Sequence, residues 1–145
     1  MTDKYEKMVS FPTVKKVWGT EVIMCSTELY TLKRFIIHPM SCVSLHWHHN
    51  KDETFIFGGT EVIVYVTGML HKVTDGNVRV KPKEHHSFYS LYGGILYETS
   101  TKDDAKDNVR IFESQHRISY EDWIGLIRKH DGCIPVKTWS VDARK

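Results

Sequence analysis

Residues 17–113 form a succession of short apolar stretches that are rich in Val, Ile, Tyr, Phe and Thr. Gly, Asp, Asn, Pro and Ser separate the stretches, which is the pattern of β-strands joined by turns. No segment among them has apolar residues at helical spacing. The predicted strands are residues 21–25, 29–38, 42–48, 54–57, 61–66, 77–80, 86–90, 95–99 and 109–112.

Three glycine-containing groups interrupt this pattern: Gly58-Gly59, Asp75-Gly76-Asn77 and Tyr92-Gly93-Gly94. Such groups favour tight turns, so a turn is expected at each. Many short strands at this spacing predict an antiparallel sandwich or barrel. The number of strands fits an all-β double-sheet jelly roll, also called a double-stranded β-helix.

After residue 114 the pattern changes to helical spacing. Ser119 followed by Asp122 predicts a helix start, and Gly132 predicts its end. The apolar face of this helix would consist of Tyr120, Trp123, Ile124 and Ile127. We therefore expect one domain, with residues 1–116 forming a barrel with an N-terminal strand extension. Residues 117–145 would pack on it as a helix and tail. The apolar tail, with Ile134-Pro135-Val136 and Trp139, could cover the barrel mouth or form a subunit contact.

Composition narrows the function classes. The 145 residues carry a net charge of +2 without a stripe of Lys and Arg, which argues against nucleic acid as a partner. The chain has no apolar run of about 18 residues and no N-terminal apolar leader, so neither a membrane span nor export is expected. The three cysteines are far apart, so no disulfide framework is expected either. A cytoplasmic protein is the prediction.

The segment His46-Trp47-His48-His49-Asn50-Lys51-Asp52-Glu53 carries the clearest chemistry. Side chains two apart on a strand lie on the same face, so His46 and His48 can converge. A short connection would bring Glu53 into the same space. One histidine alone is most often a hydrogen-bonded core residue, but this combination is a good ligand set for a divalent transition metal. Trp47 and His49 would lie on the opposite face and serve in packing.

A fourth ligand is expected from His85-His86. Only one of two adjacent residues can face the interior of a regular strand. His86 is the expected ligand because Phe88 and Ser90 would follow it along the inner face. His85 is the alternative.

These segments resemble the two motifs of the cupin superfamily. Ser44 through Gly59 is similar to the first motif, which has His-x-His, three or four residues, Glu and a later Gly. Gly76, Pro82 and His86 resemble the second, although Lys83 or Glu84 stands where Gly is usual. Residues 17–113 also resemble the type II mannose-6-phosphate isomerase cupin domain and the D-lyxose isomerase-like sugar isomerases. Trp18-Gly19, residues 29–34, Pro39, Glu98 and Asp107-Asn108-Val109-Arg110 carry this narrower resemblance.

The resemblance implies one divalent transition metal (Zn, Mn, Fe, Ni or Co) held by His46, His48, Glu53 and His86, with open positions for substrate. It implies an aldose–ketose isomerase acting on a sugar or sugar phosphate of the mannose-6-phosphate or lyxose/mannose type.

Glu98 is the candidate base of this reaction. Lys33 could stabilise an enediolate or hold a phosphate, and Arg34 would replace it if strand parity is reversed. A polar wall that includes Tyr30 and Tyr97 would favour a sugar.

The alternatives are a mononuclear non-haem iron dioxygenase and a non-catalytic sugar-binding cupin. A homodimer formed through exposed sheets is also expected.

Overall fold

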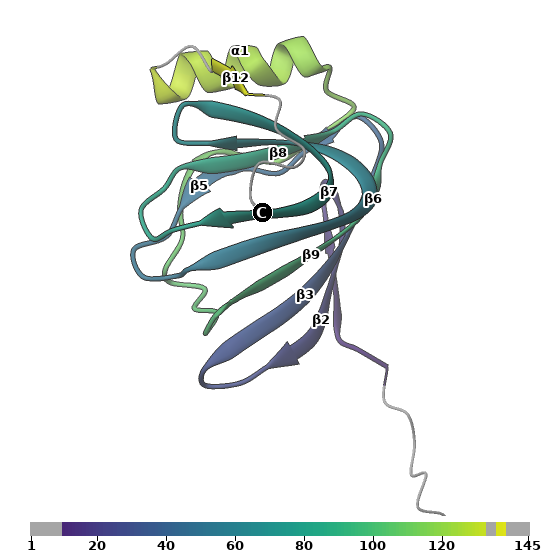
Figure 1. The fold of residues 1–145 in the computed structure, drawn as a ribbon, viewed down its shortest axis with the longest axis vertical. Coiled ribbons are helices and arrows are strands. Elements are labelled where there is room, and N and C mark those ends of the chain that lie inside the picture. Colours follow the sequence, from purple (N-terminus) through teal and green to yellow (C-terminus); the bar gives the residue numbers. More distant parts are fainter. Residues whose placement is uncertain (1–9, 133–135, 139–145) are drawn as a thin grey trace, which may run out of the picture.

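The computed structural model describes residues 10–132 and 136–138 as a curled sheet with one helix packed on its outside (Figure 1). The elements are β1 (Thr13–Lys16), β2 (Gly19–Ser26), β3 (Tyr30–Ile37), β4 (Ser41–Cys42), β5 (Leu45–Trp47), β6 (Glu53–Val66), β7 (Met69–Val80), β8 (His86–Ser90), β9 (Gly94–Thr101), β10 (Val109–Phe112), β11 (Gln115–His116), α1 (Tyr120–Asp131) and β12 (Val136–Thr138). Pairing is antiparallel except between β7 and β12. The predicted all-β jelly roll is confirmed.

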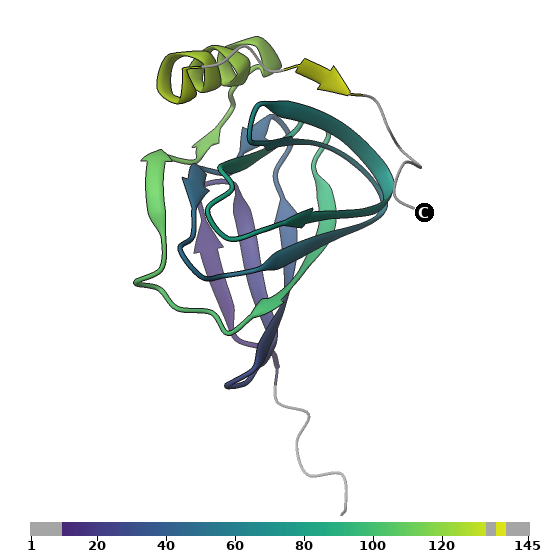
Figure 2. The same cartoon turned by 60° about the vertical axis from the view of Figure 1, so that its left-hand side comes forward.

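The curled sheet has two walls, one containing β9 and the other containing β8, and strand β6 belongs to both. Its first part pairs with β9, with Phe55 opposite Glu98, and its second part pairs with β8, with Val66 opposite His86. The register shifts between Gly58 and Val62, where the strand bends. Strand β7 follows β6 on both sides of this bend. The two strands therefore turn the corner together, and the sheet closes into a half-open barrel (Figure 2).

The wall formed by β1, β2, β3, β9 and the first part of β6 places alternate residues inside the barrel. On β3, Lys33, Phe35 and Ile37 are buried, whereas Ile36 is exposed. The inner core is apolar away from the polar end of the cavity, and includes Trp18, Phe35, Phe55, Phe57, Val64, Phe88 and Leu96. Each such side chain stabilises the fold by roughly 1.5–3 kcal/mol. Because a one-residue slip would expose all of them, this core fixes the register that positions the polar residues.

Helix α1 packs on the outside of the wall that contains β5 and β8. It begins as predicted, with the Asp122 amide donating to the Ser119 hydroxyl at 3.1 Å, and it ends at Gly132 in the left-handed region. Trp123, Ile124 and Ile127 form its buried face. With residues of the wall they make a second core, which includes Cys42, Leu45, Tyr65, Leu70, Tyr89, Phe112 and Ile118. The predicted helix and its apolar face are confirmed.

Some sequence-based predictions of turns and strands were wrong. Asp75-Gly76-Asn77 lies within β7, where Gly76 pairs with Phe57 and has a φ of 130°. This glycine allows the β6–β7 ribbon to bend rather than reverse. The reversal is made by Thr67 and Gly68, both with positive φ, as a two-residue hairpin turn requires. The predicted strand over residues 42–48 is split into β4 and β5.

The tail residues Ile134, Pro135 and Trp139 lie outside the described residues, so their place over the barrel mouth or in a subunit contact stays a prediction. Strand β12 pairs in parallel with β7, with Val136 opposite Met69. Within residues 10–132 and 136–138, no helix combines the length and apolar character that crossing a membrane requires.

Candidate metal centre

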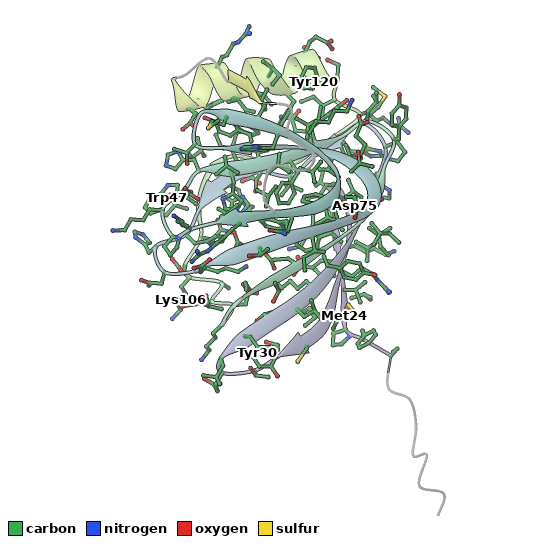
Figure 3. The ribbon with its side chains drawn as sticks, viewed as in Figure 1. Met24, Tyr30, Trp47, Asp75, Lys106 and Tyr120 are labelled. Atoms are coloured by element: carbon green, nitrogen blue, oxygen red, sulfur yellow. The ribbon has the colours of Figure 1, made fainter. Side chains whose placement is uncertain are left out.

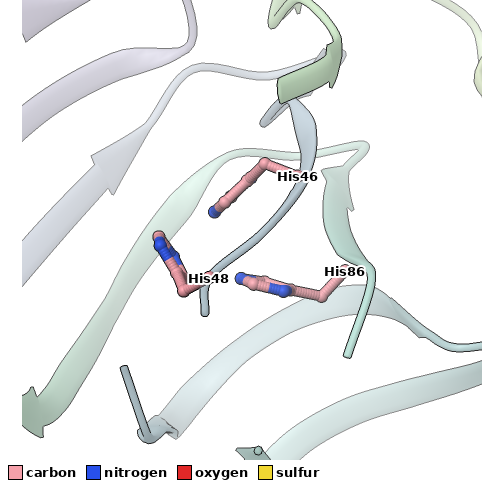
Figure 4. Close-up of side chains that lie close together, drawn as sticks. All are labelled: His46, His48 and His86. Atoms are coloured by element: carbon pink, nitrogen blue, oxygen red, sulfur yellow. The ribbon is translucent and has the colours of Figure 1, made fainter. Parts of the chain in front are cut away.

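Three histidines from neighbouring strands converge inside the barrel. His46 lies on β5 directly opposite His86, the first residue of β8, and His48 follows the end of β5. One ligand nitrogen from each lies within 4.8 Å of those of the other two. Their rings point toward a common space (Figure 4). The short strand β5 and its antiparallel register with β8 therefore bring together the three histidines that the sequence singled out.

The backbone fixes the orientation of all three rings. The Nδ1 atom of His46 hydrogen-bonds the Ser44 carbonyl at 2.9 Å, and that of His86 hydrogen-bonds the Glu84 carbonyl at 3.0 Å. The Nδ1 atom of His48 hydrogen-bonds the Asp107 carbonyl. Because a carbonyl only accepts, each Nδ1 must carry a proton, so each Nε2 presents a lone pair when the ring is neutral. Histidines that bind metals are commonly held in this way.

The inward-facing nitrogens fit a metal ion. When these rings are neutral, the buried Nε2 atoms of His48 and His86 find no donor among the described residues, although buried polar atoms are normally paired. Glu53 is beside them, with Oε2 2.9 Å from His86 Nε2 and Oε1 3.5 Å from His48 Nε2. Burial and the neighbouring His86 hold the pKa of His46 well below its usual value, so this imidazole is neutral as a ligand must be. Nitrogens and a carboxylate are donors suited to a divalent transition metal.

Lys51 connects this centre to Glu98 and was missed by the sequence analysis. Its side chain is 6% exposed, and its Nζ lies 3.0 Å from Glu53, 3.1 Å from Glu98 and 3.1 Å from Asp103. Burial favours the neutral amine, but these three carboxylates outweigh it and raise the pKa of Lys51. Lys51 is therefore a permanent cation. A lysine in a polar loop ordinarily points to solvent, so no local pattern marked it.

Glu98 lies inside the barrel, as the alternation on β9 requires. It is opposite Lys33 on β3 and opposite Phe55 on β6, and only 3% of it is exposed. Burial and the nearby carboxylate of Glu53 raise the pKa of Glu98 to about 8. A carboxyl group with such a pKa can both accept and give a proton near neutral pH.

Lys33 also faces the interior, 7% exposed, while Arg34 lies on the outer face opposite Tyr97. Lys33, and not the alternative Arg34, is therefore the residue of β3 that lines the interior. Lys33 Nζ lies 2.7 Å from Asp103 and 2.9 Å from Glu21. Burial alone would lower the pKa of Lys33, but Glu98 and these two carboxylates outweigh burial and raise it, so Lys33 is charged. Tyr30 is exposed and Tyr97 is on the outer face, so the expectation that they form the polar wall was wrong.

Asp107 organises the loop after His48. Its carboxylate accepts hydrogen bonds from the backbone amides of His49 at 2.5 Å, Asn50 at 2.9 Å and Lys51 at 3.1 Å. Burial alone would raise the pKa of Asp107, but these amides lower it. The same residue also accepts from His48 through its carbonyl. Asp107 was noted only as part of a family resemblance, and its contact spans a sequence distance that no local pattern reveals.

The centre opens into a cavity of about 400 Å³. One part of its wall is apolar, with Trp18, Phe35, Val43, Phe55 and Phe88. The other part is charged. Its carboxylates are Glu21, Glu53, Glu98, Asp103, Asp104 and Glu113, and its cations are Lys16, Lys33, Lys51 and Arg110. Such a cavity suits a small polar molecule with one less polar face.

The other histidines lie away from this centre. His49 is exposed and its ring contacts Trp47, which lies at the surface (Figure 3). His85 is partly exposed and its Nδ1 lies 2.7 Å from Asp131 at the end of α1. Among the described residues, His46, His48 and His86 are the one group of three or more potential ligands this close together.

No family model matches this chain, and no curated protein matches its sequence. Solved structures do match its fold. A cupin of the RmlC-like type from Shewanella frigidimarina has a TM-score of 0.59 at 15% identity, covering 72% of this chain and 96% of its own. Pac13 from Streptomyces, a nucleoside dehydratase, has a TM-score of 0.63 at 9% identity, covering 78% and 91%.

These likenesses, together with the curled antiparallel sheet, define the class: the chain has the cupin fold. A third similar structure is the capsular polysaccharide assembling protein CapF from Staphylococcus aureus, with a TM-score of 0.61 at 17% identity. The alignment covers 69% of this chain but only 32% of CapF, so the chain spans about a third of that protein. The narrower resemblance to mannose-6-phosphate isomerases finds no counterpart among these three.

Proposed function

We propose that this protein is a metal-dependent aldose–ketose isomerase that acts on a small sugar. The observation that carries the proposal is the arrangement of His46, His48 and His86, with each Nδ1 tied to a carbonyl and each Nε2 aimed at a shared space beside Glu53. These four residues would hold one divalent transition metal (Zn, Mn, Fe, Ni or Co). When bound, such an ion supplies Lewis-acid polarisation of a sugar carbonyl, which makes the neighbouring C–H more acidic.

Glu98 has the properties of the base in this reaction. It is buried in the cavity wall, and its raised pKa suits proton transfer at neutral pH. Its carboxylate would accept the proton from C2 of the aldose and return it to C1, while a hydroxyl proton moves between the two oxygens. The products and reactants are isomers, so no co-reactant is needed.

The two buried lysines support Glu98. Lys51 holds Glu53 and Glu98 in fixed positions, since its Nζ contacts both carboxylates. Lys33 is the cross-strand partner of Glu98 and keeps a positive charge beside the place where an enediolate would form. The density of charge in this wall also favours a polyhydroxy substrate over the apolar substrate of a dioxygenase.

The proposal is tested by proton exchange. Protein loaded separately with Zn, Mn, Fe, Ni or Co is incubated in deuterated water with D-lyxose, D-mannose and D-mannose 6-phosphate. We expect deuterium at C2, detected by NMR, together with the matching ketose. The Glu98→Gln variant should lose at least about a hundredfold in rate, in line with general-base catalysis, and should retain its metal.

Other results would support the alternatives. Absence of exchange over the whole panel, with metal content verified, would refute the isomerase. Oxygen consumption by the iron form would then favour a dioxygenase, and sugar binding without turnover would favour a binding protein.

A further inference from the structure

We propose that the cavity takes an uncharged sugar and excludes phosphorylated ones, and that Asp103 is the specificity-determining residue. The inference rests on the proposed function for the identity of the substrate. Buried lysines beside a sugar site are ordinarily candidates for phosphate ligands.

The donors of Lys51 are all occupied, and two of the three donors of Lys33 are occupied as well. Lys51 has three N–H donors, and its Nζ contacts three carboxylates, those of Glu53, Glu98 and Asp103, all within 3.1 Å. Lys33 contacts Glu21 at 2.9 Å and Asp103 at 2.7 Å. At most one donor of Lys33 is left, which is enough for a sugar hydroxyl but not for a phosphate, which presents several acceptor oxygens.

The remaining cations of the wall are paired as well. Lys16 lies 3.6 Å from Glu21, and Arg110 lies 3.0 Å from Glu113. The six carboxylates of the wall outnumber its four cations. Binding a phosphate dianion at the buried lysines would therefore require separating buried ion pairs.

Asp103 is the carboxylate that keeps both buried lysines from binding phosphate. Its Oδ2 contacts Lys33 and its Oδ1 contacts Lys51, so one side chain occupies both buried ammonium groups. It is also the most exposed partner of either lysine, with 37% of its side chain accessible, and it lies in the loop after β9 rather than on a strand. Replacing it by Asn would keep one acceptor oxygen and turn the other into an NH₂ group, which frees a donor on one of the two lysines.

The test compares wild type, Asp103→Asn and Asp104→Asn. Asp104 also lies in the cavity wall, but its carboxylate accepts from the Lys106 amide at 3.0 Å, so it controls for the change in net charge. Binding of D-mannose, D-mannose 6-phosphate and inorganic phosphate to metal-loaded protein is measured by calorimetry, and C2 exchange is measured for both sugars.

In wild type we expect binding and exchange with the free sugar and at least tenfold weaker binding of both phosphates. Asp103→Asn should gain roughly tenfold in affinity for phosphate, because the lysine that loses its carboxylate oxygen can form a charge-assisted hydrogen bond to phosphate. Asp104→Asn should gain much less.

Tight phosphate binding by wild type, or equal gains in both variants, would overturn this inference and leave the isomerase standing. If neither sugar exchanges, the isomerase fails, and inorganic phosphate binding still decides the role of Asp103.

Discussion

Asp107 shows how one side chain can organise a site that it does not enter. Its carboxylate holds three consecutive amides, and its carbonyl orients the ring of His48. In Asp107→Asn one oxygen becomes an NH₂ group, which cannot accept from an amide. We expect metal affinity to fall roughly 10–100-fold, the usual effect of losing a residue that supports a ligand.

Competition with a chromogenic chelator would measure this loss, with Asp104→Asn, in the same loop, as the matched control. Unfolding by urea should show that the Asp107→Asn protein remains folded. Unchanged metal affinity in this variant would mean that the loop keeps its shape without the carboxylate.

The residues of the candidate site differ in how far the sequence could predict them. His46, His48 and Glu53 lie within eight positions, so strand parity for the two histidines and a short connection for Glu53 predicted that they would converge. His86 followed from the same rule on a later strand. Lys51, Asp103 and Asp107 could not be predicted, because their roles arise from contacts between segments about 50 residues apart that only the folded barrel brings together.

At the scale of elements, the helix could be predicted because its determinants are local. The Ser119 cap, the spacing of Trp123, Ile124 and Ile127, and Gly132 all lie within one segment. The β6–β7 ribbon could not be predicted from the sequence, because its bend near Gly58 and Gly76 depends on which wall each half of the ribbon joins. Glycine permits a bend and a turn equally well, and only the pairing partners distinguish the two.

The helix gives a graded prediction of stability. Ser119→Ala removes the cap and should cost about 1 kcal/mol of unfolding free energy. Trp123→Ala should cost about 3–5 kcal/mol, because the ring is fully buried against the wall and its Nε1 donates to Ser87 at 3.0 Å. Arg128→Ala, on the exposed side, should change stability by less than about 0.5 kcal/mol. Urea unfolding followed by circular dichroism measures all three, and equal losses for Trp123 and Arg128 would contradict the packing of α1 as a core element.

At the scale of the whole molecule, the homodimer remains a prediction. The wall formed by β3, β9 and the first part of β6 carries Ile36, Ile56 and Ile95 on its outer face. Each is about two-fifths exposed, and Ile36 lies directly opposite Ile95. Pairing of two copies through this face would remove these side chains from water. Light scattering should give twice the chain mass, and Ile95→Lys should give the single mass. Leu29→Lys, at the β2–β3 hairpin tip, is the control and should remain dimeric. A monomeric wild type would contradict the prediction.

Metal binding should stabilise the whole barrel, because its expected ligands come from three different parts of the sheet. His46 lies on β5, His86 on β8 and Glu53 on β6, so an ion bound to them would link strands of both walls. A ligand present at a hundred times its Kd adds about 2.7 kcal/mol to the unfolding free energy. For a chain of this size, that corresponds to a rise in Tm of roughly 6–12 °C. Scanning calorimetry with metal and with EDTA measures it.

The adjacent histidines provide the decisive comparison for this effect. His48→Ala should abolish most of the metal-dependent rise in Tm, because it removes a ligand whose Nε2 faces the centre. His49→Ala should leave the rise intact, since His49 is exposed and contacts Trp47. Elemental analysis of both variants should show metal loss in the first alone. Equal Tm shifts in the two variants would mean that metal binds elsewhere and that strand parity does not select the ligands.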